Sequence, residues 1–385
     1  MRVKKMSIYL DHAATTPLHP SVREAMLPFL DEHFGNPSSL HAYGRTARHA
    51  VDEARQQVAE AIGADAGEIM FTSGGTESDN AALWGCLLAQ REQGKDHIVT
   101  STVEHKAVLE SCHYLETLGF RVTYVPVTSS GQVLPQDIAE AIEEKTALIS
   151  VMYGNNEVGT VNPIKEIGEI ARQHQLPVHT DAVQVIGKKE VNVSVLPVDL
   201  LSLSSHKVNG PKGVGALYVR MGTHFRPMLY GGSQERKRRG GTENVAGIVG
   251  FGKAISLATS STAAAFARLA GLRQAMMTEW DRLGLSYHLN GHERDHLPHI
   301  LNVSFVGVET ETLLMNLDLA GIACASGSAC TSGTLEVSHV LEAMNLPIEE
   351  ARSAVRFSFG MGNEETDVIR AAQVTADIVA RLRGE

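Results

Sequence analysis

Leu200-Leu201-Ser202-Leu203-Ser204-Ser205-His206-Lys207-Val208-Asn209-Gly210-Pro211-Lys212-Gly213 joins an apolar, strand-like run to a polar segment rich in turn-forming residues. We expect this arrangement to hold Lys207 at the end of a buried strand rather than leave it in free solvent. A lysine forms a Schiff base only as the neutral amine, so it needs partial burial or a nearby positive charge to lower its pKa. Most lone lysines at strand ends are simply solvated. The role of Lys207 therefore depends on what the rest of the chain supplies.

Other short apolar runs alternate with helical patterns along the chain. We expect strands over residues 69–72, 97–101, 121–125, 147–152, 178–181, 200–204 and 215–219. Helical patterns are found at 51–62, 134–144 and 164–173. This alternation predicts an α/β fold with βαβ units around a mostly parallel sheet, in which ligands gather at the carboxyl ends of the strands. The last two strands are joined by a Gly-Pro-Lys-Gly turn, which allows an antiparallel pair.

Length and composition restrict the class of protein. A chain of 385 residues is too long for one ordinary core, so two domains are expected. The net charge of −10 argues against a nucleic-acid backbone as the main ligand, although Arg236-Lys237-Arg238-Arg239 is a local basic run. We predict no secretory signal and no membrane span, because the most apolar long stretch, 245–270, is interrupted by Lys253 and Arg268. Four cysteines without a C-x-x-C pair indicate free thiols, no metal site and a cytoplasmic protein.

The pattern changes after about residue 245. A long helical region runs to about residue 285, and a strand-like run at 300–305 opens a second series of helix and strand patterns. We interpret this part as a smaller C-terminal α/β domain that is joined by the N-terminal arm. The large domain is predicted over residues 16–260, and the small domain over residues 1–15 and 261–385.

The run Thr72-Ser73-Gly74-Gly75-Thr76-Glu77 follows one expected strand and opens a helix. Glycines let backbone N–H groups approach an anion, and the helix N-terminus adds further donors and a favourable dipole. The run is neither a P-loop nor a dinucleotide-binding motif. It predicts a phosphate site, with an ordinary helix capped by Ser or Thr as the alternative.

Asp181 stands at the end of another expected strand. A carboxylate there can keep a pyridine nitrogen protonated, which lets pyridoxal phosphate act as an electron sink; it can also cap the next helix. Asp181 and Lys207 end two strands, and Gly74-Gly75-Thr76 follows a third. Three complementary groups at three strand ends arise by chance far less often than any one of them.

A series of motifs runs along the chain between about residues 9 and 360. In order, they are Tyr9-Leu10-Asp11-His12-Ala13-Ala14-Thr15-Thr16-Pro17, Gly35-Asn36-Pro37-Ser38-Ser39, Ser73-Gly74-Gly75-Thr76-Glu77-Ser78, Asn155-Asn156-Glu157-Val158-Gly159, His179-Thr180-Asp181-Ala182-Val183-Gln184, Ser204-Ser205-His206-Lys207, Arg239-Gly240-Gly241-Thr242-Glu243-Asn244 and Ser326-Gly327-Ser328-Ala329-Cys330-Thr331-Ser332-Gly333. Through these motifs the chain resembles the cysteine desulfurases of the NifS/IscS group. This resemblance implies a fold-type I pyridoxal-phosphate enzyme with a seven-stranded, mostly parallel sheet and a smaller C-terminal α/β domain. It also implies that L-cysteine is converted to L-alanine.

The resemblance assigns roles around the cofactor ring. Lys207 would carry the Schiff base and move the proton at Cα, while Asp181 holds the ring nitrogen and Gln184 the ring oxygen. His105 would stack on the ring and help with acid–base steps, and Asn156 would contact the cofactor or the substrate.

The resemblance also assigns roles around the cofactor phosphate. The predicted phosphate ligands are Gly75, Thr76, Ser204 and His206, with Thr242 reaching across from a partner subunit. A homodimer is therefore part of the prediction. The basic run at 236–239 is better explained by its place beside Thr242 than as a nucleic-acid patch.

Two further residues act on the substrate according to the resemblance. Arg356 would clamp the substrate carboxylate, which a forked guanidinium suits better than an ammonium. Cys330 lies in a run of small residues suited to a mobile loop, where a thiolate could attack the substrate sulfur and leave as a persulfide. We interpret Cys86 and Cys112 as buried small hydrophobes, and place Cys324 on the strand that leads into the loop.

The chain departs from the family in two places. Ser205 stands where relatives usually have glycine, and a single helix pattern follows Asn363. This ending favours relatives that pass sulfur to a tRNA 2-thiouridylase, with an iron–sulfur scaffold as the other acceptor. The alternatives are a selenocysteine lyase or aminotransferase on the same fold, and a non-catalytic sulfur-relay adaptor.

Overall fold

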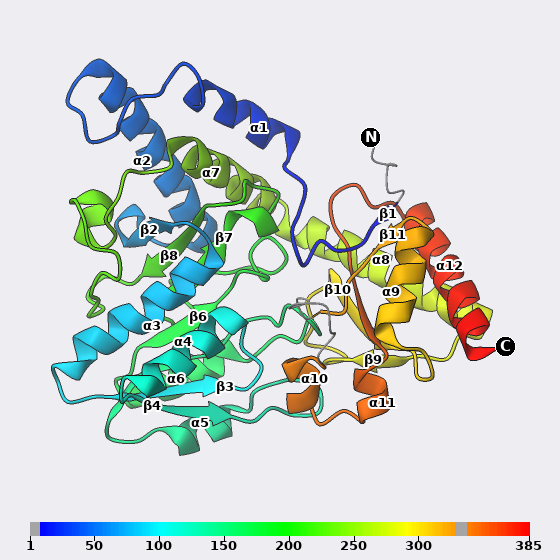
Figure 1. Ribbon diagram of the computed structural model, residues 1–385. Coiled ribbons are helices and arrows are strands. Elements are labelled where there is room, and N and C mark those ends of the chain that lie inside the picture. The colour runs from blue at the N-terminus through cyan, green and yellow to red at the C-terminus, as the bar shows by residue number, and fades with distance from the viewer. Residues whose placement is uncertain (1–7, 328–336) are drawn as a thin grey trace.

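The apolar run before Lys207 forms a central strand of a seven-stranded sheet, as the computed structural model of residues 8–327 and 337–385 shows (Figure 1). Strand β8 pairs antiparallel with both of its neighbours, and the other pairs are parallel. The predicted seven-stranded, mostly parallel sheet is therefore confirmed. Its spatial order is β2 (Ile69–Thr72), β8 (Gly215–Val219), β7 (Leu200–Ser204), β6 (Val178–Asp181), β5 (Thr146–Ser150), β3 (His97–Ser101) and β4 (Arg121–Val125).

Six of the seven strands predicted for this sheet have the observed bounds. The expected strand 147–152 begins one residue earlier and ends at Ser150. Its end is set by a contact distant in sequence, because the Met152 amide donates to the Glu104 carboxylate at 3.0 Å instead of extending the sheet.

Helices cover both faces of this sheet, which explains why its strands are apolar runs rather than alternating ones. One face packs against α3 (Gly75–Arg91) and α4 (Lys106–Thr117). The other face packs against α2 (Ala42–Ile62), α5 (Pro135–Ala141), α6 (Ile164–Gln173) and α7 (Val245–Thr259). Helix α2 is longer than the predicted 51–62, because His41 caps it by accepting from Gly44 N at 3.3 Å.

A second core surrounds the fully buried Trp280. The N-terminal strand β1 joins it by pairing in parallel with β11, as expected for the N-terminal arm. The predicted helical region 245–285 is broken near Ser260 into α7 and α8. The elements of this core are β1 (Ile8–Tyr9), α8 (Thr262–Leu283), β9 (His288–Asn290), β10 (Ile300–Ser304), α9 (Thr310–Leu319), β11 (Ile322–Ala323), β12 (Ala354–Ser358) and α12 (Glu365–Arg383).

The remaining elements are short connections between these two bodies or on their surfaces. They are α1 (Pro20–Met26), η1 (Leu27–Phe29), η2 (Ala66–Glu68), η3 (Ser205–Lys207), η4 (Gln234–Lys237), α10 (His339–Ala343) and α11 (Ile348–Ala351). The domain boundaries at 15/16 and 260/261 stay a prediction. No helix within 8–327 or 337–385 has the length and apolar character needed to cross a bilayer.

Candidate active site

The carboxyl ends of β2, β6 and β7 lie on the same edge of the sheet, because β2 runs parallel to β7 across the antiparallel β8. A cavity of about 280 Å³ opens there. Most of the predicted cofactor residues line it. The lining residues are Ala14, Gly75, Thr76, Asp79, His105, Met152, Asn156, Asp181, Val183, Gln184, Ser204, His206 and Lys207.

Lys207 ends the short 3-10 helix η3 directly after β7. The N-terminal arm holds this segment: Lys207 Nζ donates to the carbonyls of Ala13 and Ala14 at 2.5 and 2.9 Å, and Thr16 Oγ1 donates to His206 O at 2.7 Å. Burial, and secondarily the positive charge of Arg356, lowers the pKa of Lys207 to about 8. The lysine therefore has the oriented, partly neutral amine that its proposed chemistry requires.

Asp181 is 7% exposed and lies among other buried carboxyls. Its Oδ1 accepts from Val183 N at 2.8 Å, and no helix begins there, so Asp181 does not cap a helix. Burial raises the pKa of Asp79 well above its usual range, and raises the pKa of Glu104 to about 8. Burial also raises the pKa of Asp181, whereas the charges of His105 and Lys207 and the Val183 amide act in the opposite direction. Asp181 is therefore the carboxyl of this group whose charged form is favoured by positive groups that line the cavity.

The phosphate site predicted from the sequence lies at the first turn of α3, and Gly74, Gly75 and Thr76 are called the cradle below. Gly74 has φ 154° and ψ −175°, a region open essentially to glycine alone. A Cβ on Gly75 would lie 3.0 Å from Val183 Cγ2, so the backbone passes close to the segment after β6. No side chain caps this helix end, which excludes the predicted Ser or Thr cap. Its first amides remain available to an anion.

His105 caps α4 with its side chain. Its Nδ1 accepts from Ala107 N at 3.1 Å, so the proton of the neutral ring is on Nε2. The protein atoms packed around the ring lower its pKa, while the charge of Asp181 raises it. The ring lines the cavity and is neutral near pH 7.

His206 and Gln184 are held from the N-terminal arm as well. The ring Nδ1 of His206 lies 3.1 Å from Thr15 Oγ1, and burial lowers its pKa to about 4. Gln184 is buried, and its Nε2 donates to Ala13 O at 2.9 Å. Both side chains are therefore fixed and neutral at the cavity wall.

Arg356 on β12 lies behind the cavity rather than in its wall. It is 4% exposed; its Nη2 donates to Asp11 Oδ1 at 2.9 Å and its Nη1 to Asn156 O at 2.7 Å. Its Nε is buried and has no hydrogen-bond partner among the described residues. Arg356 thus ties Asn156 and Asp11 together beside Lys207, with guanidinium N–H groups left for a further acceptor.

Besides Arg356, two predicted site residues are not seen in the cavity wall. Thr242 is exposed and absent from the lining, and Cys330 lies outside the described residues. The basic run before Thr242 is engaged within the chain: Arg239 Nε binds Glu77 Oε1 at 2.8 Å, and Arg238 Nη2 donates to Gly67 O at 2.8 Å. This loop is therefore fixed to the helix that carries the cradle.

Sequence analysis missed several residues of the site. Asp79 and Met152 line the cavity, and Glu104 lies behind His105 with its pKa raised to about 8. In the sequence, Glu104 directly precedes the predicted site residue His105. Its neighbours in the chain, however, do not distinguish a buried carboxyl from a solvated one. The buried thiols were predicted correctly, since Cys86 and Cys112 are 0% exposed.

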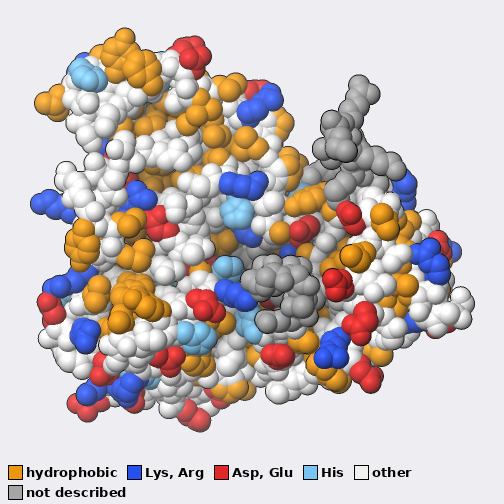
Figure 2. All heavy atoms as spheres, in the orientation of Figure 1, with side chains coloured by type: hydrophobic (Ala, Val, Ile, Leu, Met, Phe, Trp, Pro, Cys, Tyr) orange, Lys and Arg blue, Asp and Glu red, His pale blue; other side chains and the backbone are white. Residues whose placement is uncertain are grey.

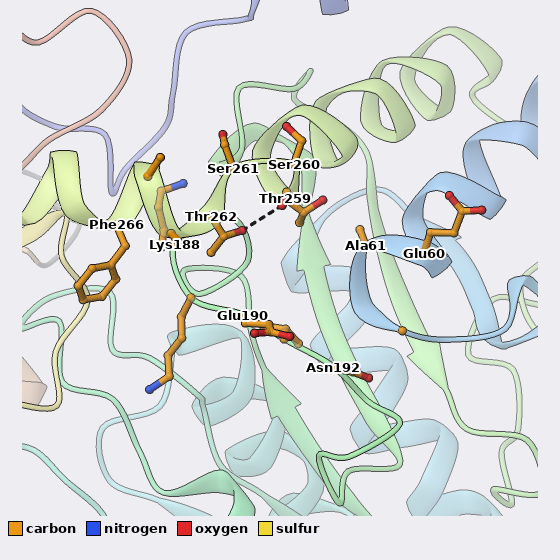
Figure 3. A pocket seen from close by; sticks show the side chains of 15 residues that line it. Glu60, Ala61, Lys188, Glu190, Asn192, Thr259, Ser260, Ser261, Thr262 and Phe266 are labelled. Atoms are coloured by element: carbon orange, nitrogen blue, oxygen red, sulfur yellow. Dashed lines mark hydrogen bonds between the residues drawn. The ribbon is translucent and has the colours of Figure 1, made fainter.

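A larger cavity of about 930 Å³ lies between the end of α2 and the junction of α7 with α8 (Figure 3). Its wall includes Glu60, Lys188, Glu190 and Phe266, and none of the predicted site residues. Cavity volume alone therefore does not locate the site. The site is recognised instead by titratable groups with shifted pKa values, such as Lys207 and His206. Figure 2 shows histidine and basic side chains near the middle of one face.

The residues at the smaller cavity fit pyridoxal phosphate. The uncapped amides of α3 suit its phosphate, the Asp181 carboxyl suits a protonated ring nitrogen, and the buried Lys207 amine suits its aldehyde. The negative charge of Glu77 in the first turn of α3 is balanced by Arg239, whose Nε lies 2.8 Å from Glu77 Oε1.

Comparisons with known proteins agree with this geometry. The family model for class-V aminotransferases matches residues 8–370. Cysteine desulfurase IscS of Dictyoglomus turgidum is 51% identical and that of Methanosarcina thermophila 50%; the alignments cover 98% of this chain and 96% and 93% of the relatives. A solved structure described as a NifS-like protein superposes with a TM-score of 0.91 at 37% identity, covering 97% of this chain and 99% of its own.

A second solved structure, described as SspA in complex with cysteine, has a TM-score of 0.81 at 37% identity and covers 92% of this chain and 99% of its own. The sheet, the cavity chemistry and the near full-length matches all lead to the same assignment. The chain belongs to the class-V aminotransferase family, as a cysteine desulfurase that depends on pyridoxal 5′-phosphate.

Proposed function

We propose that this enzyme converts L-cysteine to L-alanine and receives the substrate sulfur on Cys330 as a persulfide. The main support for this proposal is that Lys207, Asp181, His105 and the uncapped first turn of α3 line the same cavity. When bound there, pyridoxal phosphate supplies an electron sink for the bond changes at the substrate. The reaction needs no outside oxidant, because cysteine and a thiol together contain the atoms of alanine and a persulfide.

Lys207 moves the proton at the substrate Cα. A base works best when its pKa lies near the working pH, and burial lowers the pKa of Lys207 to about 8. The carbonyls of Ala13 and Ala14 aim its Nζ. His105, with its proton on the Nε2 that Ala107 leaves free, assists in the acid–base steps.

Asp181 and Gln184 hold the cofactor ring at its nitrogen and its oxygen. Gly75, Thr76, Ser204 and His206 hold the phosphate, for which the uncapped start of α3 supplies the amides. These residues would hold the cofactor ring and its phosphate in the cavity that Lys207 also lines.

Arg356 and Asn156 bind the substrate. The guanidinium keeps its Nε unpaired among the described residues and is held in place by Asp11 and by Asn156 O. A carboxylate paired with a forked guanidinium gains two directed, charge-assisted hydrogen bonds. We infer that this pair fixes the carboxylate of L-cysteine.

The experiment compares Cys330→Ser with Cys324→Ser, measuring alanine release and labelled persulfide from L-cysteine. Cys330→Ser should lower alanine release by at least about 100-fold, because the reaction loses its nucleophile. The control Cys324→Ser should retain activity, since this thiol is not assigned to the site. Unchanged alanine and sulfide release by Cys330→Ser would favour a selenocysteine lyase or another reaction on this fold.

We infer that the enzyme acts as a homodimer in which Thr242 reaches the phosphate of the partner's site. The loop that carries Thr242 is bound through Arg239 to Glu77, in the first turn of α3. Exposed apolar side chains gather over α1, η1 and the start of α2, as expected for a surface that a partner covers (Figure 2). They include Leu27, Leu30, Phe34, Leu40 and Tyr43.

The sulfur acceptor is a second protein in this proposal. A tRNA 2-thiouridylase is the favoured acceptor and an iron–sulfur scaffold the other candidate, both from the sequence resemblance. Direct nucleic-acid binding is not part of the proposal, because Arg238 and Arg239 are engaged within the chain.

A further inference from the structure

One buried histidine, His299, lies behind the cavity wall and is not explained by the reaction. His299 is 3% exposed and directly precedes β10. Its backbone is anchored, since Phe359 N donates to His299 O at 2.9 Å. Its ring Nε2 lies 3.3 Å from Oε1 of Gln184, a residue of the cavity wall. His299 itself touches no part of the cavity.

The proton on His299 can be placed from its neighbours. The carbonyl of Ala13 only accepts hydrogen bonds, so the amide nitrogen of Gln184 must be the atom that faces it at 2.9 Å. The amide oxygen of Gln184 then faces His299, and the ring Nε2 must be the donor. This fixes the neutral tautomer of His299 with its proton on Nε2.

The surroundings keep His299 neutral. Burial holds its pKa well below the usual range, and the charges of Lys188, His12, Arg356 and Lys207 act in the same direction. Lys188 belongs to the wall of the neighbouring larger cavity (Figure 3). The ring Nδ1 has no hydrogen-bond partner among the described residues, so the Gln184 contact is the one that orients the ring within them.

We propose that His299 is a positioning residue that, together with Ala13 O, holds the Gln184 amide with its nitrogen end toward the cofactor. With Oε1 held by His299 and one Nε2 hydrogen held by Ala13 O, the second Nε2 hydrogen is left to donate into the cavity. A flipped amide would present an acceptor to the cofactor's ring oxygen, where a donor is needed. The inference rests on the proposed contact of Gln184 with that oxygen.

The same hydrogen bonds link His299 to the reactive lysine. Ala13 O accepts from both Gln184 Nε2 and Lys207 Nζ. Gln184 and His299 are 115 positions apart in the sequence. His299 directly precedes β10, which contributes side chains to the second core. A shift of this segment would therefore change the position of Gln184 through His299, and that of Lys207 through the shared Ala13 carbonyl.

The test compares five variants as purified protein: His299→Leu, His299→Gln, His299→Asn, Gln184→Ala and the double variant His299→Leu/Gln184→Ala. The readouts are the dissociation constant for pyridoxal phosphate and the visible spectrum of the bound cofactor. We expect His299→Leu and Gln184→Ala each to weaken binding by about 5- to 10-fold, the effect of one neutral hydrogen bond. The double variant should be no weaker than Gln184→Ala alone, because His299 acts through Gln184.

Conservative variants separate this role from simple packing. Gln at position 299 can place a donor where Nε2 lies, so His299→Gln should restore binding and spectrum. His299→Asn places its donor near the Nδ1 position and should restore neither cofactor binding nor the spectrum. This variant also replaces His299→Leu in the test if His299→Leu does not fold. Unchanged binding in both His299→Leu and His299→Asn, or independent losses that multiply in the double variant, would overturn the inference. Unchanged binding in Gln184→Ala would overturn the proposed contact of Gln184 itself.

Discussion

The rate at which cofactor-free enzyme takes up pyridoxal phosphate should follow the titration of Lys207. Only the neutral amine attacks the aldehyde of the cofactor. Burial lowers the pKa of Lys207 from 10.5 to about 8. At pH 7 this shift raises the neutral fraction by about 300-fold over an ordinary lysine. The uptake rate should therefore rise through a midpoint near pH 8.

The variant Arg356→Gln tests the electrostatic part of this explanation. The positive charge of Arg356 is the second cause, after burial, of the low pKa of Lys207. Removing this charge makes the protonated amine less unfavourable, so the pKa rises and the midpoint moves to higher pH. Arg226→Gln is the control, since that arginine lies in an exposed pair with Glu92. It should leave the midpoint unchanged.

The assay mixes cofactor-free enzyme with pyridoxal phosphate and records the change in absorbance between about pH 6 and pH 10. The same reaction with an Nα-acetylated lysine amide corrects for the titration of the cofactor itself. A wild-type midpoint near that of free lysine would refute the assignment of a buried, activated amine. A midpoint that falls or stays fixed in Arg356→Gln would refute the electrostatic reasoning.

Two more predictions test the anchoring of the Thr242 loop and its reach. Glu235→Ala should lower the free energy of unfolding by about 3–5 kcal/mol, because the side chain of Arg55, only 8% exposed, loses the partner that lies 2.7 Å away. The control is Glu92→Ala at an exposed ion pair, which should lower the free energy of unfolding by less than about 1 kcal/mol. Equal shifts of the thermal midpoint would contradict this. Mixed dimers of Thr242→Ala and Lys207→Ala should regain one site with wild-type cofactor affinity, and no gain on mixing would show that Thr242 serves its own subunit.

The strands could be predicted from the sequence because each is a short apolar run between turn residues. Except in the edge strand β4, their side chains are buried on both faces of the sheet, so local composition predicts their place directly. The exception, residues 147–152, ends early because the buried Glu104 takes the Met152 amide. That contact spans 48 positions and leaves no local signal.

The site was predicted from motifs, and the cavity brings most of those residues together. Lys207, Asp181 and the Gly75-Thr76 cradle each follow a strand, so their meeting follows from the parallel sheet. The helix-cap alternatives at Asp181 and at the cradle were wrong, because no helix follows Asp181 and no side chain caps α3.

The sequence by itself determined the strand order along the chain, the reactive residue types and the family. Tertiary structure alone decided their electrostatic state. The pKa of Lys207 and Glu104 depends on burial by segments distant in sequence, and the roles of Arg55, Glu235 and His299 depend on contacts across 180 and 115 positions. A residue's neighbours in the chain specify its chemistry and its place on a strand. Its charge and orientation are specified by neighbours in space, which only the folded chain assembles.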